Sequence, residues 1–457
     1  MGFVKPFVET LELVGWTREM VTKFGPVVRV WNFGRPNVLV SSSDLAIALK
    51  KLQKEGAVDD KSADVKDFAV AINGIGLVSL PPEVHTRHKK FWNPFFNWRN
   101  IESILPDMQE EGIKVVNQLE KYAGRDSISQ CKVFNLPPYA IRATFNITCC
   151  TAFGKDFMDT MSDDTANAYI HDFHTVAVNL SRRAFRPWLN KDFIYYSTPE
   201  GRRTKRSAER GASLMKEAIE FRRNLRNCGS NGGNCIQGDY KCFLDRLLDM
   251  KEQGVLNEAQ IVGELNVFVA GGYDTSAVVI SLVMYHLAIH PDHQEKIVQE
   301  LQEVLGPDFG SNNNYPLTWD IIKNFKHLDL LYPLVPVLPR RSTQDIKLED
   351  GKMIPKGVDV FILTDIIHRD PKYFEEPNAF KPERHSGTPI PSFMPFSLGN
   401  RTCVGQTMGM VTVKIIVAHL LMRYVWETTE TKEGFKTLFQ TLQVPVSVNC
   451  KIRKRTM

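Results

Sequence analysis

The most informative stretch of the chain is FSLGNRTCVG at residues 396–405, which sets five residues in the order F-x-x-G-x-R-x-C-x-G: Phe396, Gly399, Arg401, Cys403 and Gly405. The two glycines lack Cβ atoms, so the backbone of this loop can approach a flat ligand closely. The arginine offers a permanently charged fork for an acidic group. Residues 405–426 follow as an apolar helix, whose positive N-terminus would favour the thiolate form of the cysteine. The stretch therefore predicts a thiolate presented to a flat, acidic cofactor.

A cysteine thiolate in this setting is typical of a heme ligand, because the soft sulfur pushes electron density onto iron and favours O–O cleavage. The alternative for Cys403 is a buried free cysteine, which packs as a small hydrophobic residue. The five matched positions favour the heme ligand. The segment resembles the cytochrome P-450 superfamily of heme-thiolate monooxygenases. The resemblance implies that Cys403 is the metal ligand, the axial thiolate of the iron in a heme b.

The resemblance extends over nearly the whole chain and implies a mainly α fold with a small β region, the cytochrome P-450 fold, as a single domain over residues 1–457. Two segments read as the β region, residues 25–45 and residues 335–365, because apolar residues alternate there between glycine and proline turns. The intervening periodicity is mainly helical. In this fold the heme lies between a long distal helix and the cysteine loop.

The apolar stretch from Val267 to Ile289 is long enough to cross a membrane. Its interior carries Asp274 and His286, and an ionisable residue there would be costly in lipid. We therefore expect a long helix buried in a globular protein.

That expected helix contains a second chemical signal, AGGYDTS at residues 270–276. Two adjacent glycines, Gly271 and Gly272, cost about 1 kcal/mol each in a helix relative to alanine, and close passage over a flat ligand would explain them. Thr275 can bond to the Gly271 carbonyl, disturb the helical ladder and open a polar notch. The resemblance places dioxygen in this notch, steadied by Thr275, with Asp274 relaying protons. The alternative is an ordinary helix with a solvent-facing Asp-Thr pair.

The resemblance also implies which side chains hold the heme propionates: Arg401, Arg340, His85 and Lys89. The last two stand where the family usually has tryptophan and arginine. Because lysine gives a point charge and not a bidentate fork, we expect a weaker clamp. A related branch often carries a glutamate at the position of Gly271 that esterifies the heme. Glycine cannot form this bond, so the heme should be non-covalent apart from the iron–sulfur ligation.

The largest departure from the family lies in HLDLLYP at residues 327–333, where a helix bearing E-x-x-R is expected and is absent. The resemblance pairs that helix with Arg384. We expect Arg384 to take a new acid, with Asp329 as the candidate, or to lie exposed. Losing one side of a buried ion pair costs about 3–5 kcal/mol, so we expect low heme occupancy. A degenerate member with impaired heme binding and little or no catalysis is the alternative function.

The net charge and the absence of a dinucleotide-binding motif indicate which partners the protein has. A formal net charge of +5 over 457 residues argues against a dedicated nucleic-acid binder. The chain has no dinucleotide fingerprint, so electrons should come from NADPH through a separate NADPH-cytochrome reductase flavoprotein. The substrates would be dioxygen and a lipophilic small molecule.

The resemblance implies that the protein lies at the cytosolic face of the endoplasmic reticulum. We expect no membrane span in residues 1–20. The mixture of aromatic and basic residues at 186–189 and 193–196 is typical of peripheral membrane contact, and a buried helix junction would explain it equally well.

Overall fold

The computed structural model describes residues 2–455 except for residues 4–11, 33, 59, 63–65, 67–68, 72–73, 125–130, 185, 190, 231–241, 307–308, 310–316, 327–333, 349, 386–387, 433 and 440–441. Helices predominate, as predicted: α1 (Glu12–Phe24), α2 (Ser43–Lys54), α4 (Pro82–Trp92), α5 (Trp98–Leu119), α6 (Pro137–Phe153), α7 (Lys155–Thr160), α8 (Asp163–Ala184), α9 (Asp192–Ser197), α10 (Pro199–Ser230), α11 (Phe243–Glu252), α12 (Glu258–Ile289), α13 (Pro291–Leu305), α14 (Trp319–Ile322), α15 (Thr364–Ile367) and α16 (Gln406–Arg423).

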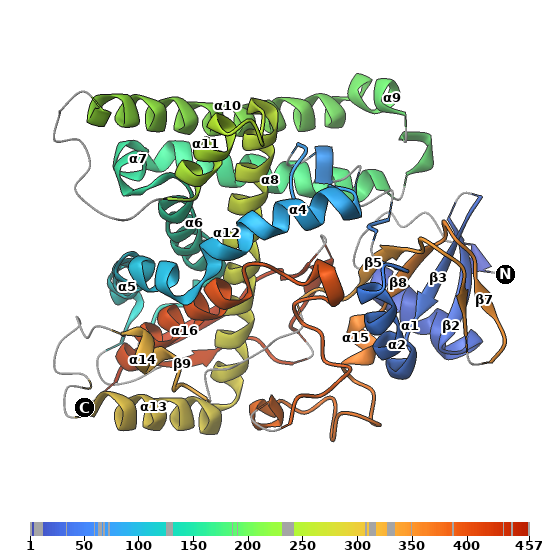
Figure 1. Ribbon diagram of the computed structural model, residues 1–457. Helices are drawn as coiled ribbons and strands as arrows, with labels where there is room; N and C mark the ends of the chain where they lie inside the picture. The colour runs from blue at the N-terminus through green and yellow to red at the C-terminus, as the bar shows by residue number, and fades with distance from the viewer. Residues whose placement is uncertain are drawn as a thin grey trace.

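The largest sheet joins the two segments that the sequence indicated as β. Its strand order is β1-β2-β3-β8-β5, made by β1 (Gly2–Phe3), β2 (Val27–Asn32), β3 (Arg35–Val40), β8 (Asp359–Ile362) and β5 (Leu338–Arg341). β2 and β3 form an antiparallel hairpin, whose turn contains Gly34 at a φ of 83°. β3 then pairs with β8 in parallel. The sheet lies at one side of the molecule with α1, α2 and α15 around it (Figure 1).

Smaller sheets complete the β structure: β4 (Phe134–Asn135) with β12 (Asn449–Lys454) and β9 (Tyr424–Thr428), β6 (Ile346–Lys347) with β7 (Met353–Ile354), and β10 (Thr437–Phe439) with β11 (Gln443–Pro445). The mainly α fold with a small β region is therefore confirmed.

The long apolar helix α12 runs through the middle of the helical part of the molecule (Figure 1). It begins at a capping box formed by Asn257 and Gln260, and it ends before Pro291, the first residue of α13. It packs along α6, α16 and β9. Among the described residues it is the one helix long and apolar enough to cross a membrane, and 72% of its most apolar window is buried inside the protein. The expected buried core helix is therefore present.

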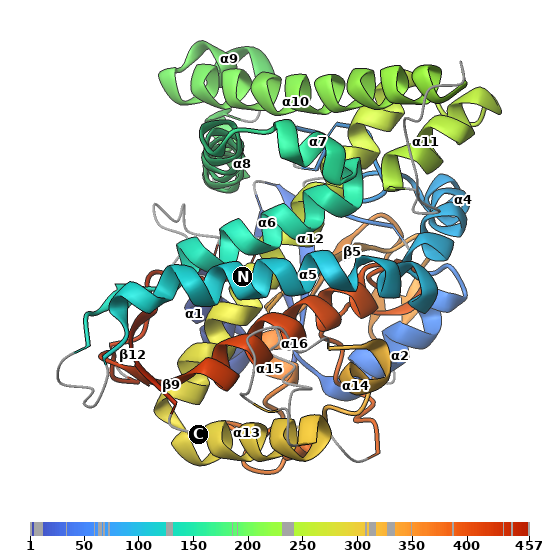
Figure 2. The same cartoon turned by 90° about the vertical axis from the view of Figure 1, so that its left-hand side faces the viewer.

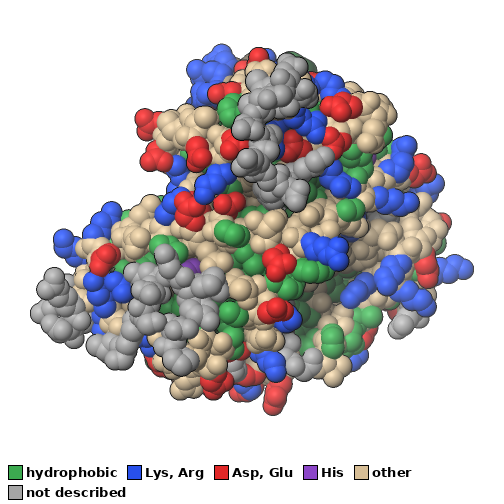
Figure 3. Space-filling view, turned by 60° about the vertical axis from the view of Figure 1, so that its left-hand side comes forward, with side chains coloured by type: hydrophobic (Ala, Val, Ile, Leu, Met, Phe, Trp, Pro, Cys, Tyr) green, Lys and Arg blue, Asp and Glu red, His purple; other side chains and the backbone are tan. Residues whose placement is uncertain are grey.

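The helices on either side of α12 form layers. α10 lies over α8, and α6 crosses beneath them toward α5 (Figure 2). On the face shown in Figure 3, Lys and Arg side chains are interspersed with Asp and Glu, so this face presents no field of a single sign.

Candidate active site

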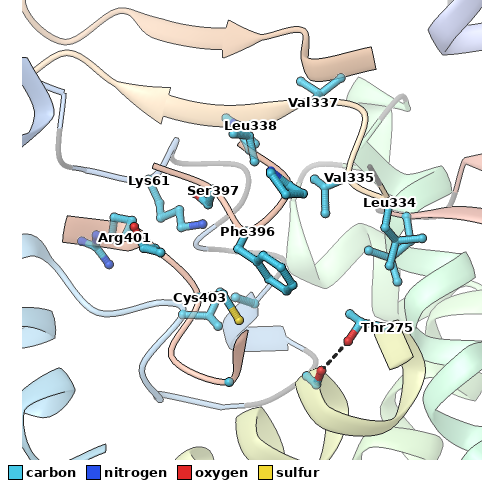
Figure 4. Close-up of a pocket in the computed structure, with 18 of the residues that line it drawn as sticks. Lys61, Thr275, Leu334, Val335, Val337, Leu338, Phe396, Ser397, Arg401 and Cys403 are labelled. Carbon is cyan, nitrogen blue, oxygen red and sulfur yellow. Dashed lines mark hydrogen bonds between the residues drawn. The ribbon is translucent and has the colours of Figure 1, made fainter. Parts of the chain in front are cut away.

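The chemical motifs of the sequence meet at one cavity of about 720 Å³ between α12, the cysteine loop and the main sheet (Figure 4). Its walls are largely apolar and include Leu77, Phe96, Val267, Phe268, Leu334, Val335, Val337, Leu338 and Phe361. Such walls suit a lipophilic ligand, and the few polar groups among them therefore stand out as candidates for chemistry.

Cys403 lies in the wall of this cavity and turns its sulfur into it (Figure 4). The loop is held by a backbone hydrogen bond from the Cys403 N–H to the Phe396 carbonyl, 2.9 Å long, and Ser397 adopts a φ of 73°. Phe396 also lines the cavity, beside the sulfur. The side chain of Cys403 is exposed, and the space that it faces is the cavity.

A backbone hydrogen bond at the start of α16 favours the Cys403 thiolate, as predicted, but burial opposes it and raises the pKa of the thiol. Burial raises the pKa of the thiol above its usual value, while a hydrogen bond from the Gly405 backbone and the charges of Lys89 and Lys61 lower it only partly. α16 does begin at Gln406 with Gly405 as its N-cap, as the sequence indicated, but desolvation outweighs the helix terminus. A metal ion bound by the sulfur would favour the thiolate, because a coordinating thiol loses its proton.

Glycine is required for different structural reasons at different positions of the two motifs. A Cβ on Gly271 would meet nothing within 4 Å, and Gly271 lines the cavity, so it leaves room for a ligand. Gly405 also lines the cavity, with the Cys403 sulfur 4.0 Å from where a Cβ would lie. Both positions agree with a close approach of the backbone to a flat group.

Two of the glycines predicted to contact the cofactor are explained by packing instead. A Cβ on Gly272 would come within 2.6 Å of the Thr148 side chain, so this glycine lets α12 and α6 pack closely, although it also borders the cavity. Gly399 is not among the described residues that line the cavity. It has a φ of 59°, and a Cβ there would lie 2.7 Å from the Gln53 side chain of α2. For Gly399, the expected macrocycle contact is replaced by a turn and a helix contact.

Thr275 takes the predicted position. Its hydroxyl donates to the Gly271 carbonyl at 2.8 Å, and the residue lines the cavity (Figure 4). The alternative of a solvent-facing threonine is therefore excluded. The predicted disturbance of the helical ladder does not interrupt the helix, because α12 is helical throughout Glu258–Ile289. The hydrogen bond is accommodated within the regular ladder.

Asp274 is not among the described residues of the cavity wall. Its Oδ1 lies 3.7 Å from the Nε2 atom of His174 on α8. Burial raises the pKa of the Asp274 carboxyl, and the nearby His174 only partly offsets this effect. Neighbouring residues on a helix point about 100° apart, which separates Asp274 from the cavity that Thr275 faces. The sequence did not indicate His174, because no motif marks it.

Of the four predicted donors to an acidic group, Arg401 and His85 line the cavity. Arg401 is buried, and its guanidinium donates to the Leu80 carbonyl at 3.0 Å and lies 3.9 Å from Asp60. His85 is 5% exposed, and burial, followed by the charges of Arg401, Lys89 and Lys61, lowers its pKa to about 3. The imidazole of His85 is therefore neutral near pH 7 and can donate one hydrogen bond without adding charge.

The other two predicted donors are not among the described residues that line the cavity, and they hold the cysteine loop instead. The ammonium of Lys89 donates to the carbonyls of Asn400 and Thr402 at 2.7 and 2.8 Å. The fully buried Arg340 donates to the Ser397 hydroxyl at 2.6 Å and to the Pro339 carbonyl. Their contribution is therefore to position the loop that carries Cys403.

One cation in the cavity wall was missed by the sequence analysis. Lys61 follows α2 in a segment without a recognisable motif, and its amine points into the cavity near Cys403 (Figure 4). Burial, followed by the charges of Arg340 and Arg401, lowers the pKa of Lys61 well below its usual value, and Cys403 acts in the opposite direction. Nothing in the local sequence could have identified it.

The residues present fit a heme. The cavity wall combines one sulfur that can ligate iron, a glycine position open to a flat group, and the basic side chains Lys61, Arg401 and His85, which suit acidic side chains of the macrocycle. The apolar walls suit the rest of the macrocycle and a lipophilic substrate.

Within the described residues, the side chain of Arg384 hydrogen-bonds to backbone and is not fully exposed, while its predicted contact with Asp329 stays untested. Its guanidinium donates to four backbone carbonyls, those of Glu375, Glu376, Ala379 and Lys381. Burial lowers its pKa. Asp329 and the rest of residues 327–333 lie outside the described residues. The meander around Arg384 is thus held by its own backbone.

Comparison with known proteins agrees with this geometry. The model of the Cytochrome P450 family matches residues 7–449. Cytochrome P450 4V2 of Mus musculus is 28% identical over 442 residues, which cover 92% of this chain and 80% of that protein. Cytochrome P450 4c3 of Drosophila melanogaster is 26% identical over 458 residues, covering 95% and 82%. Cytochrome P450 4F2 of Homo sapiens is 27% identical over 442 residues, covering 93% and 82%.

Proposed function

The chain belongs to the cytochrome P450 family, and we propose that it is a heme-thiolate monooxygenase that inserts one atom of dioxygen into a lipophilic substrate. The observation that carries the proposal is that a single, largely apolar cavity contains both the sulfur of Cys403 and Thr275 (Figure 4). These two residues come from distant segments, and each was identified by its own motif. Their meeting at one cavity is the arrangement that oxygen chemistry above a thiolate-ligated iron requires.

In this proposal the residues of the chain hold and orient the heme, which supplies the oxygen-activating chemistry when bound. Cys403 would ligate the iron through its sulfur. Arg401 and His85 would bind the propionates, the first with a charge and the second with a neutral N–H. Gly271 and Gly405 would leave room for the macrocycle, and the apolar walls would exclude water from it.

Protons would be supplied from the α12 side of the cavity. The Thr275 hydroxyl donates its hydrogen to the Gly271 carbonyl, which leaves the lone pairs of its oxygen available as acceptors. Asp274, one position earlier, holds a proton to a higher pH than an ordinary aspartate because burial raises its pKa. His174 lies 3.7 Å from the Asp274 carboxyl, on α8. We propose that Thr275 positions the oxygen and that Asp274 serves as the proton reserve.

Electrons would come from NADPH through an NADPH-cytochrome reductase flavoprotein, as is general for microsomal members of the family. The proposed location is the cytosolic face of the endoplasmic reticulum. Trp188 and Phe193 are 59% and 77% exposed, on the segment that the sequence indicated for membrane contact. Exposed aromatic residues beside basic ones, such as the nearby Arg186, support peripheral contact with a lipid surface.

The reduced carbon-monoxide difference spectrum tests the function. The full chain should give the thiolate-type absorption, Cys403→Ser should lose it with unchanged helical content, and the matched control Cys131→Ser should keep it. A spectrum of damaged ligation in the parent chain would favour the degenerate alternative. No heme absorption, or an unchanged spectrum in Cys403→Ser, would overturn the proposal.

A further inference from the structure

We propose that His174 carries protons from solvent to Asp274 and so refills the proton reserve of the site. The inference rests on the proposed monooxygenase function and deepens it, because it names the residue that supplies the reserve. His174 lies on α8 and faces Asp274 on α12, with the His174 Nε2 and Asp274 Oδ1 atoms 3.7 Å apart.

The two facing atoms lack other partners. Both the His174 Nε2 atom and the Asp274 Oδ1 atom are buried, and neither has a hydrogen-bond partner within the described part of the chain. Buried polar atoms are nearly always hydrogen-bonded, so an unpartnered pair needs an explanation. Their separation is roughly half an ångström longer than an N–H···O hydrogen bond allows, so a small rotation of either side chain would form the bond. The geometry is that of a contact that opens and closes.

The two side chains differ in their access to water. The His174 side chain is 29% exposed and the Asp274 side chain is 15% exposed. An imidazole ring can accept a proton on one nitrogen and donate a proton from the other. Transfer from His174 would break the Nε2–H bond of the imidazolium and form an O–H bond on the Asp274 carboxylate. The ring is then neutral and takes the next proton from water.

The other titratable groups around this part of α12 do not compete with His174. Burial raises the pKa of Tyr273 on α12, of Tyr169 on α8 and of Cys149 on α6, so these three side chains stay neutral near pH 7. Burial raises the pKa of the Asp274 carboxyl, and His174 acts against this effect. Asp274 can therefore hold a proton, and His174 is the group placed to exchange it.

Infrared spectroscopy of the full chain measures the protonation of Asp274 without catalysis. The C=O stretch of its protonated carboxyl is isolated as the difference between the parent and Asp274→Asn, and it is followed as a function of pH. A nearby cation favours the carboxylate, so His174→Gln should raise the pKa of Asp274 by about one unit or more.

The matched control is His171→Gln, on the same helix. The His171 side chain is 80% exposed and lies 3.8 Å from Asp172, which Arg210 already binds. The control should leave the titration of Asp274 unchanged.

The product formed per NADPH consumed tests the transfer itself. His174→Gln should lower this ratio roughly threefold at pH 8, and the loss should grow as pH rises, because water alone must then refill Asp274. His174→Glu should restore most of the product, because a carboxyl can carry a proton although its charge is opposite. A purely electrostatic role of His174 predicts the reverse order of the two variants.

The outcomes separate this inference from the function on which it rests. An unchanged titration of Asp274 in His174→Gln, or equal loss of product in His174→Gln and His174→Glu, would overturn the role of His174 while the thiolate-type spectrum of the parent keeps the proposed function. A parent chain without that spectrum would overturn both.

Discussion

Removing the carboxylate of Glu264 should destabilise the protein more than most single substitutions. Glu264 lies on α12, and its side chain is fully buried. It contacts the Nδ1 atom of His88 at 2.5 Å and accepts hydrogen bonds from the Trp92 indole at 3.0 Å and the Leu77 backbone N–H at 3.1 Å. His88 and Trp92 belong to α4, so this one carboxylate ties the distal helix to the helix that carries His85 and Lys89.

The expected magnitude follows from these contacts. Glu264→Leu would leave three polar groups in the interior without their acceptor, and removing one side of a buried pair costs about 3–5 kcal/mol. An unfolding entropy of about 2.1 cal/mol/K per residue gives roughly 1 kcal/mol/K for a chain of 457 residues. The Tm should therefore fall by about 3–5 °C.

Differential scanning calorimetry of the full chain measures this effect, with Glu264→Gln as the matched control. Glutamine keeps an amide oxygen for the indole and the backbone N–H, and it places an amide nitrogen opposite the His88 ring. We expect it to lose less than half of what the leucine variant loses. A decrease below 1 °C for Glu264→Leu, or equal decreases for the two variants, would refute the reasoning.

Three further predictions follow from the same geometry. Thr275→Ala should retain heme and divert reducing equivalents to peroxide; equal product per NADPH consumed in variant and parent would contradict the role of the hydroxyl. Asp274→Asn should raise the Tm near pH 7, because a carboxyl with a raised pKa contributes stability that is lost as pH rises through that pKa; the gain should vanish at acidic pH, and a gain independent of pH would contradict this cause. Burial lowers the pKa of His419 to about 4. The folded protein should therefore lose stability as pH falls from about 6.5 toward 4, because the buried imidazole resists protonation. His419→Leu should flatten that loss by up to about 1.4 kcal/mol per pH unit, measured by urea unfolding at several pH values, and an unchanged slope would contradict it.

The sequence predicted the parts of the site that are local in the chain. Cys403 and Thr275 each lie in a motif of fewer than eleven residues, and the hydrogen bond from Thr275 to Gly271 follows from helix geometry alone. The hairpin of the main sheet was also predictable, because alternation and a glycine turn specify it.

The sequence could not indicate the direction in which a side chain points. Asp274 directly precedes Thr275, yet a rotation of about 100° on the helix turns it toward His174. Lys89 was expected to clamp the cofactor, but its long side chain reaches loop carbonyls instead. Lys61 and Glu264 could not be identified, because their partners come from segments that only the tertiary structure brings together.

The support of the cysteine loop bears on the expectation of low heme occupancy. The loop is held by Lys89 from α4, by Arg340 from β5, and by an amide hydrogen bond from Asn400 to the Gln53 carbonyl of α2. None of these contacts passes through Arg384. A guanidinium bound to carbonyls is held less strongly than one bound to a carboxylate, so the meander is the weaker element, but its loosening would leave the three contacts of the loop in place. Heme retention should therefore depend more on the cations that face the cavity than on the meander arginine.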